Sequence, residues 1–418
     1  MASMGKVMVA GVGMTNFGKF MERGVRSLAE EAVGEALKDS GVAPKEIQAA
    51  FFSNAIAGLI TGQEMIRGQV ALRNTGILGI PLFNVENACA SASSAFHLAW
   101  MSVASGMYDV ALAVGAEKMS HPDKSVSFRA IGTAVDLEQM RDLMARMSAK
   151  QAEAPAKSKG EAEPAGTEKK EKKSFFMDIY AASTMQYMKK SGATQQTFAD
   201  IAVKSHAFGA LNPKAQFHDR VTREQVLGAR EVSWPLTLLM CSPIGDGSAA
   251  AVLMSEEYAR KRGISKAVQV RASVVMSGTD HGSNEPTACE RVSHRAYEIS
   301  GIAPKDINVL EVHDAAAPAE LITCEELGLC PPGKGPELLA SGATNLGGKH
   351  VVNPSGGLLS KGHPIGATGI AQIVEIVDQL RGRCGARQVD GAKVGLTENG
   401  GGFLGTDAAA MAVHIFSV

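Results

Sequence analysis

One eight-residue pattern occurs twice in this chain, and no other feature of the sequence constrains the fold as strongly. Residues 40–47 read Ser-Gly-Val-Ala-Pro-Lys-Glu-Ile and residues 300–307 read Ser-Gly-Ile-Ala-Pro-Lys-Asp-Ile, so six of the eight positions are identical. Each copy follows a stretch with helical spacing, contains the glycine and proline that mark a helix end, and leads into an apolar strand. The repeat predicts two α/β halves of related structure.

Each half also contains a helix built from unusually small residues. The first begins at Cys89 and reads Cys-Ala-Ser-Ala-Ser-Ser-Ala, and the second follows His363 in His-Pro-Ile-Gly-Ala-Thr-Gly. Helices with such small side chains are normally packed between other layers, where bulky side chains would not fit. We therefore expect a duplicated α/β fold with two helices at its centre.

The two halves differ in length because the first carries an insertion. We place the N-terminal half at residues 1–119 and 240–265, an inserted loop domain at 120–239, and the C-terminal half at 266–418. Within the insertion, residues 148–173 contain seven Lys, five Glu and no side chain more apolar than alanine. This composition predicts a solvated, flexible segment, although some of its lysines could instead meet a phosphorylated ligand.

Charge and cysteine content exclude several classes of protein. With 42 Lys and Arg against 43 Asp and Glu, the net charge of -1 gives no field that would attract nucleic acid or an anionic membrane. No apolar run approaches the length that spans a bilayer. The six cysteines are scattered without a C-x-x-C pair, so we predict no disulfide, no metal site and a reducing compartment, the cytoplasm.

Cys89 lies where a predicted strand, residues 81–85, passes into the first small-residue helix. A thiol at a helix N-terminus feels the positive end of the helix dipole, which lowers its pKa and favours the thiolate. This position suits a nucleophile. The alternative is a packed core cysteine, since free cysteines are among the most buried residues.

His363 lies among glycines that cannot belong to an ordinary helix or strand. The segment 356–369 contains five glycines besides Pro364 and predicts a tightly folded loop with His363 at the N-terminus of the buried helix that follows. By the repeat, His363 is the counterpart of Cys89. The two side chains are therefore expected to face each other as a thiol and imidazole pair, although a structural hydrogen-bonding histidine is the alternative.

Two further groups of residues close predicted strands of the second half. His313 and Asp314 follow the strand at 309–312, and Glu398 precedes the triple glycine 400–402 after the strand at 393–397. Ligands bind at the carboxyl ends of strands in open α/β sheets. Asp314 is interpreted as a capping or orienting residue, whereas the glycines form either a tight turn or a set of N–H groups that converge on an oxyanion.

These features together resemble the thiolase family. The resemblance depends on Cys89 at a helix start, the Asn-x-x-Gly-Gly motif at 353–357, the Gly-His-Pro motif at 362–364, and the triple glycine. The His313-Asp314 pair is similar to the sterol-carrier-protein type of thiolase, because ordinary thiolases carry an Asn-Glu pair there.

The resemblance implies a five-layer αβαβα thiolase fold, a homodimer, and coenzyme A thioesters as substrates, with coenzyme A as co-substrate and no covalently bound cofactor. It also implies that Cys89 takes the acyl group and that His363 activates this thiol and helps to hold a thioester oxyanion. His313 would position the thioester oxygen. The surrounding oxyanion loops would contain Asn353, Gly400 and Gly401.

The sequence departs from the thiolase pattern at the second catalytic cysteine. Thiolases carry that cysteine in a C-x-G-G-G motif or, in the sterol-carrier type, directly after His-Asp, and these positions hold Glu398 and Ala315. A carboxyl group at Glu398 could shuttle the proton if apolar surroundings raise its pKa. In the alternative, Glu398 is an outer residue and another group moves the proton.

We therefore predict a thiolase that cleaves a bulky, branched or aromatic 3-oxoacyl-CoA by a reverse Claisen reaction. Two alternatives stay open: a thiolase-like retro-aldolase or Claisen condensing enzyme, and a non-catalytic acyl-CoA-binding subunit. Retention of Cys89 argues against the retro-aldolase, since an aldol cleavage needs no acyl-cysteine, and the intact pair of Cys89 and His363 argues against a non-catalytic subunit. Thiolases of the sterol-carrier type that lack a fused lipid-transfer domain often resemble subunits that work beside a small zinc-ribbon and OB-fold protein. Because this chain ends at Val418 directly after its last predicted strand, we expect no fused domain, and the resemblance implies such a partner.

Overall fold

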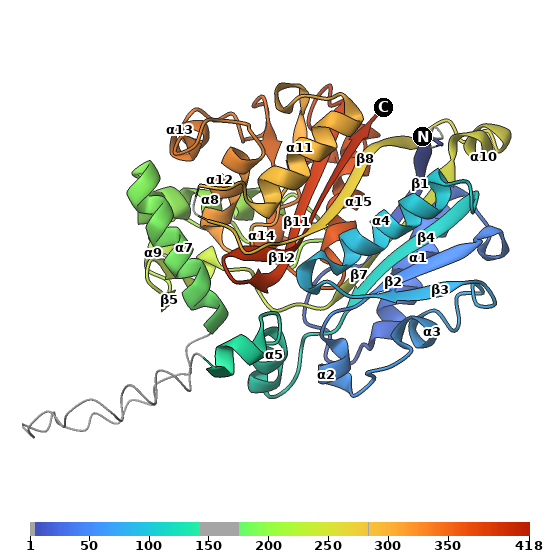
Figure 1. Ribbon diagram of the computed structural model, residues 1–418, viewed down its shortest axis with the longest axis horizontal. Helices are drawn as coiled ribbons and strands as arrows, with labels where there is room; N and C mark the ends of the chain where they lie inside the picture. The colour runs from blue at the N-terminus through green and yellow to red at the C-terminus, as the bar shows by residue number, and fades with distance from the viewer. Residues whose placement is uncertain (1–4, 143–174, 283) are drawn as a thin grey trace, which may run out of the picture.

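The computed structural model describes residues 5–142, 175–282 and 284–418, and a single continuous sheet organises the fold (Figure 1). The order of its strands is β10-β9-β11-β12-β8-β1-β7-β4-β2-β3. The N-terminal half contributes β1 (Val7–Met14), β2 (Ala49–Ser53), β3 (Leu82–Val85), β4 (Val110–Glu117) and β7 (Gly247–Ser255). The C-terminal half contributes β8 (Val268–Ser277), β9 (Val309–Glu311), β10 (Val351–Val352), β11 (Val394–Leu404) and β12 (Asp407–Ser417).

The strand pairing of one half repeats that of the other. In the N-terminal half β2 is parallel to β3 and β4, and β7 is antiparallel to β4 and β1. In the C-terminal half β9 is parallel to β10 and β11, and β12 is antiparallel to β11 and β8. The halves join where β1 and β8 pair antiparallel over the short stretch from Val7 to Val9. The predicted duplicated α/β fold is confirmed.

The eight-residue repeat occupies equivalent places in the two halves. It follows α1 (Val25–Ser40) in the first and α11 (Ala288–Ser300) in the second, and each helix ends at a glycine in the left-handed conformation, Gly41 at φ 67° and Gly301 at φ 68°. A short 3-10 helix then leads into β2 or β9. The glycine and proline of the repeat therefore have the predicted role of ending the helix before an apolar strand.

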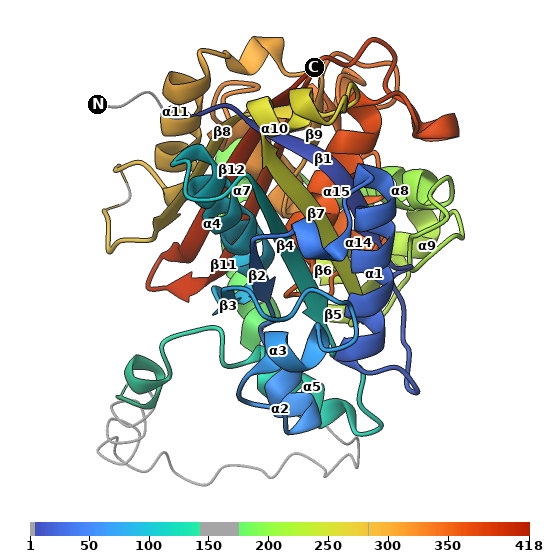
Figure 2. The same cartoon turned by 90° about the vertical axis from the view of Figure 1, so that its right-hand side faces the viewer.

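Two helices, α4 (Ser91–Ala104) and α15 (Thr368–Leu380), lie at the centre, between the two halves of the sheet (Figures 1 and 2). One hydrophobic cluster joins both helices to strands of both halves. A second cluster packs α1 on the outer face of the N-terminal strands, and a third packs α11 on the outer face of the C-terminal strands. This arrangement gives the five layers αβαβα.

The small residues of the central helices permit this close packing. A Cβ atom on Gly369 of α15 would lie 2.1 Å from the Oγ atom of Ser93 in α4, so no larger residue fits at that crossing. The predicted reason for the small residues, a position between other layers, is confirmed.

The insertion is largely helical where the structure describes it. It contains α5 (Lys124–Ile131), α7 (Phe175–Ser191), α8 (Gln195–Gly209), α9 (Arg223–Leu227), β5 (Glu231–Ser233) and β6 (Leu236–Thr237). Its apolar residues, Phe198 and Ile201 among them, share a cluster with Leu321 and Leu359 of the C-terminal half. The predicted flexible segment 148–173 lies outside the described residues, and the predicted domain boundaries stay a prediction.

Further helices within the described residues connect strands of the sheet. They are α2 (Ala57–Thr61), α3 (Arg67–Ala71), α10 (Glu256–Lys261), α12 (Ala317–Glu326), α13 (Gly335–Ala340) and α14 (Gly357–Ser360). Among the described residues, none of the helices combines the length and hydrophobicity needed to cross a bilayer. All six cysteines are free thiols.

Candidate active site

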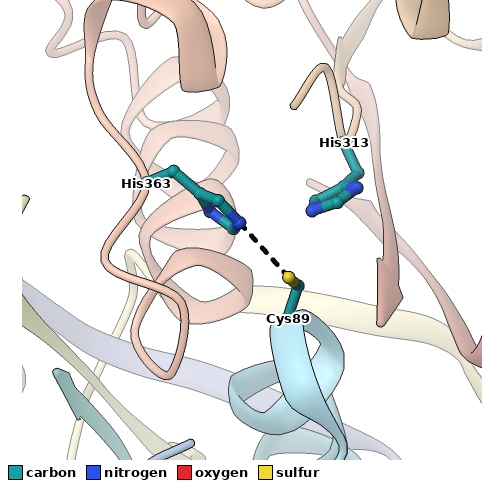
Figure 3. Close-up of side chains that lie close together, drawn as sticks. All are labelled: Cys89, His313 and His363. Atoms are coloured by element: carbon teal, nitrogen blue, oxygen red, sulfur yellow. Dashed lines mark hydrogen bonds between the residues drawn. The ribbon is translucent and has the colours of Figure 1, made fainter. Parts of the chain in front are cut away.

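Three side chains from distant parts of the sequence meet at the centre of the molecule: Cys89, His313 and His363 (Figure 3). Their sulfur and ring nitrogen atoms lie within 4.8 Å of one another. The closest contact joins the Sγ atom of Cys89 to Nε2 of His363 at 3.3 Å. The two imidazole rings are 5.1 Å apart between centroids and inclined by 72°. The predicted thiol and imidazole contact is therefore present, with His313 beside it.

A strained turn presents the thiol of Cys89. The chain leaves β3, passes through the 3-10 helix Ala88–Ala90 and continues directly into α4. Ala88 has φ 47°, a left-handed conformation that is costly for a residue with a side chain. The N–H of Ala88 donates to the carboxylate of Glu86 at 2.5 Å, which helps to hold this turn. The nucleophile candidate thus lies on a sharp bend at the start of a central helix.

The thiol is protonated at rest, and the prediction of a lowered pKa is wrong. Burial of the sulfur is the largest cause, and with the nearby Glu117 carboxylate it raises the pKa of Cys89 to about 12. The backbone N–H groups of Gly402 and of Cys89 itself act in the opposite direction, but their effect is smaller. Desolvation of a thiolate therefore outweighs the helix dipole at this position.

Hydrogen bonds fix the tautomer of His363 so that its lone pair faces the thiol. Nδ1 of His363 lies 2.7 Å from Oγ1 of Thr368, and that hydroxyl donates its only proton to the carbonyl oxygen of Pro364 at 3.0 Å. Nδ1 must then be the N–H donor, which leaves Nε2 as the acceptor toward Cys89. Burial, followed by the charges of His313 and Lys361, holds the pKa of His363 well below its usual range, so the ring is a neutral base.

The position of His363 differs from the prediction in one respect. The helix α15 begins at Thr368, so His363 lies in the preceding loop and not at the helix N-terminus itself. The residue at the helix start, Thr368, instead contacts the imidazole through its hydroxyl. The helix therefore orients the base through a side chain rather than through its dipole.

His313 follows β9 and directs its ring toward the same point (Figure 3). Burial lowers the pKa of His313 to about 4, so this imidazole is also neutral. Its Nε2 atom is buried and has no hydrogen-bond partner among the described residues. The site thus contains a polar atom with an unused hydrogen-bonding capacity, as expected of a group that meets a ligand.

A buried network holds the loop that carries His363 against β9. Nζ of Lys361 lies 3.0 Å from Oε2 of Glu311, and the N–H and hydroxyl of Ser355 donate to the same carboxylate. Oδ1 of Asp314 accepts the N–H of Leu358 at 2.7 Å. The predicted orienting role of Asp314 is confirmed, because its carboxylate fixes the first turn of α14.

Asn353 supports the end of β9. It has φ 56°, and its Oδ1 accepts the N–H of Val312 at 2.8 Å, directly before His313. Its own N–H donates to the carbonyl oxygen of Leu310. Its side-chain oxygen is therefore used by the strand end that carries His313.

Glu398 lies beside the three-residue cluster but outside it. Its Oε2 accepts the backbone N–H of His313 at 2.9 Å, and it is not among the groups whose polar atoms come within 4.8 Å of one another. Burial raises the pKa of Glu398 to about 8, with a contribution from the charge of Glu326 and against the His313 N–H bond. The carboxyl group is thus largely protonated at neutral pH.

The triple glycine lies within a strand, so the tight turn, one of the two alternatives left open by the sequence, is absent there. β11 runs from Val394 to Leu404 and pairs with β12 through Gly400 and Gly401. A Cβ atom on Gly401 would lie 2.2 Å from the carbonyl oxygen of Asn87, so this glycine permits β11 to pack against the turn before Cys89. The backbone N–H of Gly402, the third glycine, interacts with the Cys89 sulfur, and the oxyanion role of Gly400 and Gly401 stays a prediction.

Sequence reasoning missed the buried carboxylate of Glu117. It accepts the N–H groups of residues 55–57, between 2.8 and 3.3 Å, and that of Gly366 at 2.9 Å. It thereby joins the N-terminal half to the loop before α15 and contributes to the raised pKa of Cys89. A carboxylate at the end of an otherwise apolar strand, Val110–Glu117, was a signal that could have revealed it.

Comparison with known proteins agrees with this geometry. The N-terminal thiolase domain model matches residues 7–231, and the model described as the thiolase C-terminal domain-like region matches residues 272–414.

The chain aligns with similar proteins over nearly its whole length. It is 39% identical to the benzoylsuccinyl-CoA thiolase subunit BbsB of Thauera aromatica, over 95% of each protein. It is 38% identical to an acetyl-CoA acetyltransferase of Methanothermobacter thermautotrophicus, over 99% of this chain and 100% of that protein. It is 36% identical to human sterol carrier protein 2, over 95% of this chain and 70% of that protein.

A solved structure has the same fold over the whole length. The Ltp2-ChsH2(DUF35) aldolase superposes with a TM-score of 0.76 at 25% identity and covers 100% of this chain and 99% of its own. With two matching family models, relatives above 35% identity that align with at least 95% of the chain, and the Cys89 and His363 pair, the chain belongs to the thiolase family.

Proposed function

We propose that this protein is a coenzyme A-dependent thiolase that cleaves a 3-oxoacyl-CoA by a reverse Claisen reaction. The observation that carries this proposal is the 3.3 Å contact between a protonated Cys89 thiol and the lone pair of a neutral His363. A thiol with a pKa near 12 needs a base at the moment of attack. His363 is placed for that task, and its Nε2 carries no proton.

The proposed reaction proceeds in two acyl transfers. The Cys89 sulfur attacks the 3-keto carbon while its proton passes to Nε2 of His363. The bond between C2 and C3 then breaks, which leaves the acyl group on Cys89 and a coenzyme A thioester enolate that takes up a proton. A second coenzyme A gives up its thiol proton and attacks the acyl-cysteine, so that the sulfur of Cys89 is released as a thiol.

Backbone groups around Cys89 support the first transfer. The N–H groups of Gly402 and Cys89 already interact with the sulfur, which places two donors next to the carbon that the sulfur will attack. We assign them the oxyanion that forms at that carbon, since fixed donors aimed at developing charge are effective catalysts. The unpartnered Nε2 of His313 is assigned to the thioester oxygen, as the family resemblance implied.

Glu398 is proposed as the acid that replaces the missing second cysteine. With its pKa raised to about 8, the group is mostly protonated at neutral pH and can still lose its proton near that pH. It lies outside the closest cluster, which suits a group that serves the departing carbon or the incoming thiol rather than Cys89. The hydrogen bond from the His313 N–H keeps its carboxyl group in place.

The direct test is the Cys89→Ser variant, which is almost isosteric. We expect it to abolish thiolysis while the protein keeps its fold and its affinity for coenzyme A. Cys330→Ser is the matched control, because Cys330, like Cys89, is a free cysteine whose residue as a whole has intermediate exposure, but it lies outside the site. More than a few per cent of the wild-type rate in Cys89→Ser would remove this thiol from the mechanism.

We further propose that the substrate carries a bulky acyl group and that a partner subunit binds this chain. The relative from Thauera aromatica is named a benzoylsuccinyl-CoA thiolase subunit, and the solved structure is a complex with a DUF35 protein. We propose a small zinc-ribbon and OB-fold partner at the acyl end of the site, where it would exclude water. Full activity of the purified chain alone would contradict this part.

A homodimer through the β3 end of the sheet is proposed as well. β3 is the last strand at its end, Phe83 on it is 50% exposed, and Met101 on the adjacent α4 is 47% exposed. Exposed strand edges with apolar side chains pair readily with a second copy. Phe83→Asp should convert the dimer to a monomer in sedimentation experiments, and a wild-type monomer would contradict the proposal.

A retro-aldolase is the second candidate, because the solved structure with the same fold is named an aldolase. That reaction forms no acyl-cysteine and consumes no second coenzyme A. The products formed from a 3-oxoacyl-CoA and from a 3-hydroxyacyl-CoA distinguish the two candidates, because a thiolase cleaves the first substrate and a retro-aldolase the second. Consumption of free coenzyme A also distinguishes them, since only the thiolase uses it.

A further inference from the structure

We propose that Cys89, His313 and His363 also form a binding site for one thiophilic divalent cation, of which zinc is the typical example, and that this cation inhibits the enzyme. No step of the proposed reaction uses a metal. The inference depends on the resting geometry of the three side chains, which Figure 3 shows directed toward one another.

The distances suit a tetrahedral metal. With metal-to-sulfur and metal-to-nitrogen bonds of about 2.3 and 2.0 Å, neighbouring ligand atoms of a tetrahedral zinc site lie about 3.5 Å apart. The Cys89 and His363 atoms are 3.3 Å apart, so this pair already has the required separation. All three atoms lie within 4.8 Å, which leaves an adjustment of about 1 Å for the ring of His313.

The chemical state of the ligands also suits a metal. The contact with Thr368 directs the lone pair of His363 Nε2 toward the Cys89 sulfur, and a metal-binding imidazole needs such a lone pair. Nε2 of His313 is buried without a partner, so its ring can shift without breaking a hydrogen bond from that atom. The N–H of His363 is held by Thr368, an arrangement that orients metal-binding histidines in many proteins.

Binding replaces one proton with the cation. The S–H bond of Cys89 breaks, its proton passes to the solvent, and the sulfur forms a bond to the metal, as thiols at metal sites do even when their unbound pKa is high. No oxidation or reduction takes place. Three protein ligands leave the fourth tetrahedral position to water or substrate.

Metal binding and acylation exclude each other because both use the Cys89 sulfur. Zinc should therefore inhibit the enzyme, a chelator should restore it, and prior acylation should protect it. The inhibition rests on the proposed function, whereas metal binding by itself does not.

Titration with cobalt(II) tests the site without an activity assay, because a thiolate bound to cobalt gives a charge-transfer band in the near ultraviolet. We expect wild type and Cys330→Ser to bind one cobalt per chain with this band, and zinc to displace it. Cys89→Ser should lose the band, and His313→Gln should bind cobalt at least about 10-fold more weakly, since even loss of an outer partner costs that much. Thermal melting without metal establishes that each variant is folded.

Alkylation of Cys89 in the unmodified chain, mapped by mass spectrometry, gives a second test that needs no variant, and it should abolish the band. A wild-type chain without the band, or a band that survives alkylation of Cys89, would overturn the inference. If the chain binds cobalt in this way but cleaves no 3-oxoacyl-CoA, the metal site stands and the proposed function fails.

Discussion

The segments that deliver Cys89 and His363 occupy equivalent places in the two halves but have opposite surroundings. Every residue from 351 to 377 is buried, whereas no residue from 82 to 89 is fully buried. The segment with His363 is tied down by the buried ion pair between Lys361 and Glu311. The segment with Cys89 instead ends a sheet and begins a central helix after a strained residue.

This difference separates two tasks within one duplicated fold. A base must be held in one tautomer at one distance from the thiol, and a densely packed loop with satisfied buried charges provides that rigidity. A nucleophile must be reached by a large thioester, so its segment must lie near a surface that a second copy or a partner can cover. If this difference holds, the segment that carries His363 is more rigid than the segment that carries Cys89.

The largest expected effect comes from breaking the buried ion pair on the His363 side. Lys361→Met leaves the carboxylate of Glu311 buried without its countercharge, which should lower the free energy of unfolding by about 3–5 kcal/mol. Lys6→Met is the control, because Lys6 pairs with Glu256 at the surface and its loss should cost less than about 1 kcal/mol. If denaturant unfolding gave the same loss of unfolding free energy for Lys361→Met and Lys6→Met, the difference between the two segments would be refuted.

The next effect concerns Glu398, whose carboxyl group accepts the backbone N–H of His313. Glu398→Gln keeps an acceptor for the His313 N–H but cannot release a proton, so turnover should fall by roughly 10²-fold while Cys89 is still acylated. Steady-state rates and acyl-enzyme formation measure the two effects separately. Wild-type rates at all pH values would show that the proton takes another route.

The same variant makes the pKa of Glu398 visible as a dependence of stability on pH. Since the folded pKa of about 8 lies above the ordinary value of 4.5, folding favours the protonated form, and this stability is lost as pH rises from 4.5 through 8. The stability of Glu398→Gln does not fall in this way, because the glutamine side chain has no proton to lose. Its stability relative to wild type should therefore rise across this range by an amount on the order of a few kcal/mol, and a constant difference would contradict the raised pKa.

The smallest effect tests how the base is oriented. Thr368→Val removes the acceptor for the buried N–H of His363, which should lower the free energy of unfolding by about 1–3 kcal/mol and reduce turnover. Thr368→Ser keeps the hydroxyl and should restore both. If valine and serine behave alike, the tautomer of His363 is fixed by another contact.

The sequence was informative wherever one local pattern had a single structural solution. The eight-residue repeat predicted the duplicated halves, and the small residues at 89–95 and 363–369 predicted the central helices. Because these helices occupy equivalent positions, the pairing of Cys89 with His363 followed as well. Each of these inferences needed only periodicity, glycine geometry or the repeat.

The sequence failed where long-range electrostatics decides the outcome. The high pKa of Cys89 arises from burial and from Glu117, and neither the degree of burial nor that contact can be inferred from the residues next to Cys89. The glycines 400–402 were left open between a tight turn and a set of donors, because their local pattern does not show that β11 continues as a strand to Leu404. The burial of Lys361 depends on Glu311, which is distant in sequence.

The central claim is that Cys89 carries the acyl group, and mass spectrometry of the protein with a 3-oxoacyl-CoA tests it most directly. Without free coenzyme A the second transfer cannot occur, so one acyl group per chain should accumulate on the peptide that contains Cys89. The adduct should disappear when coenzyme A is added and should be absent from Cys89→Ser. Cleavage of the substrate with no adduct on Cys89, or with the adduct on another residue, would contradict the account.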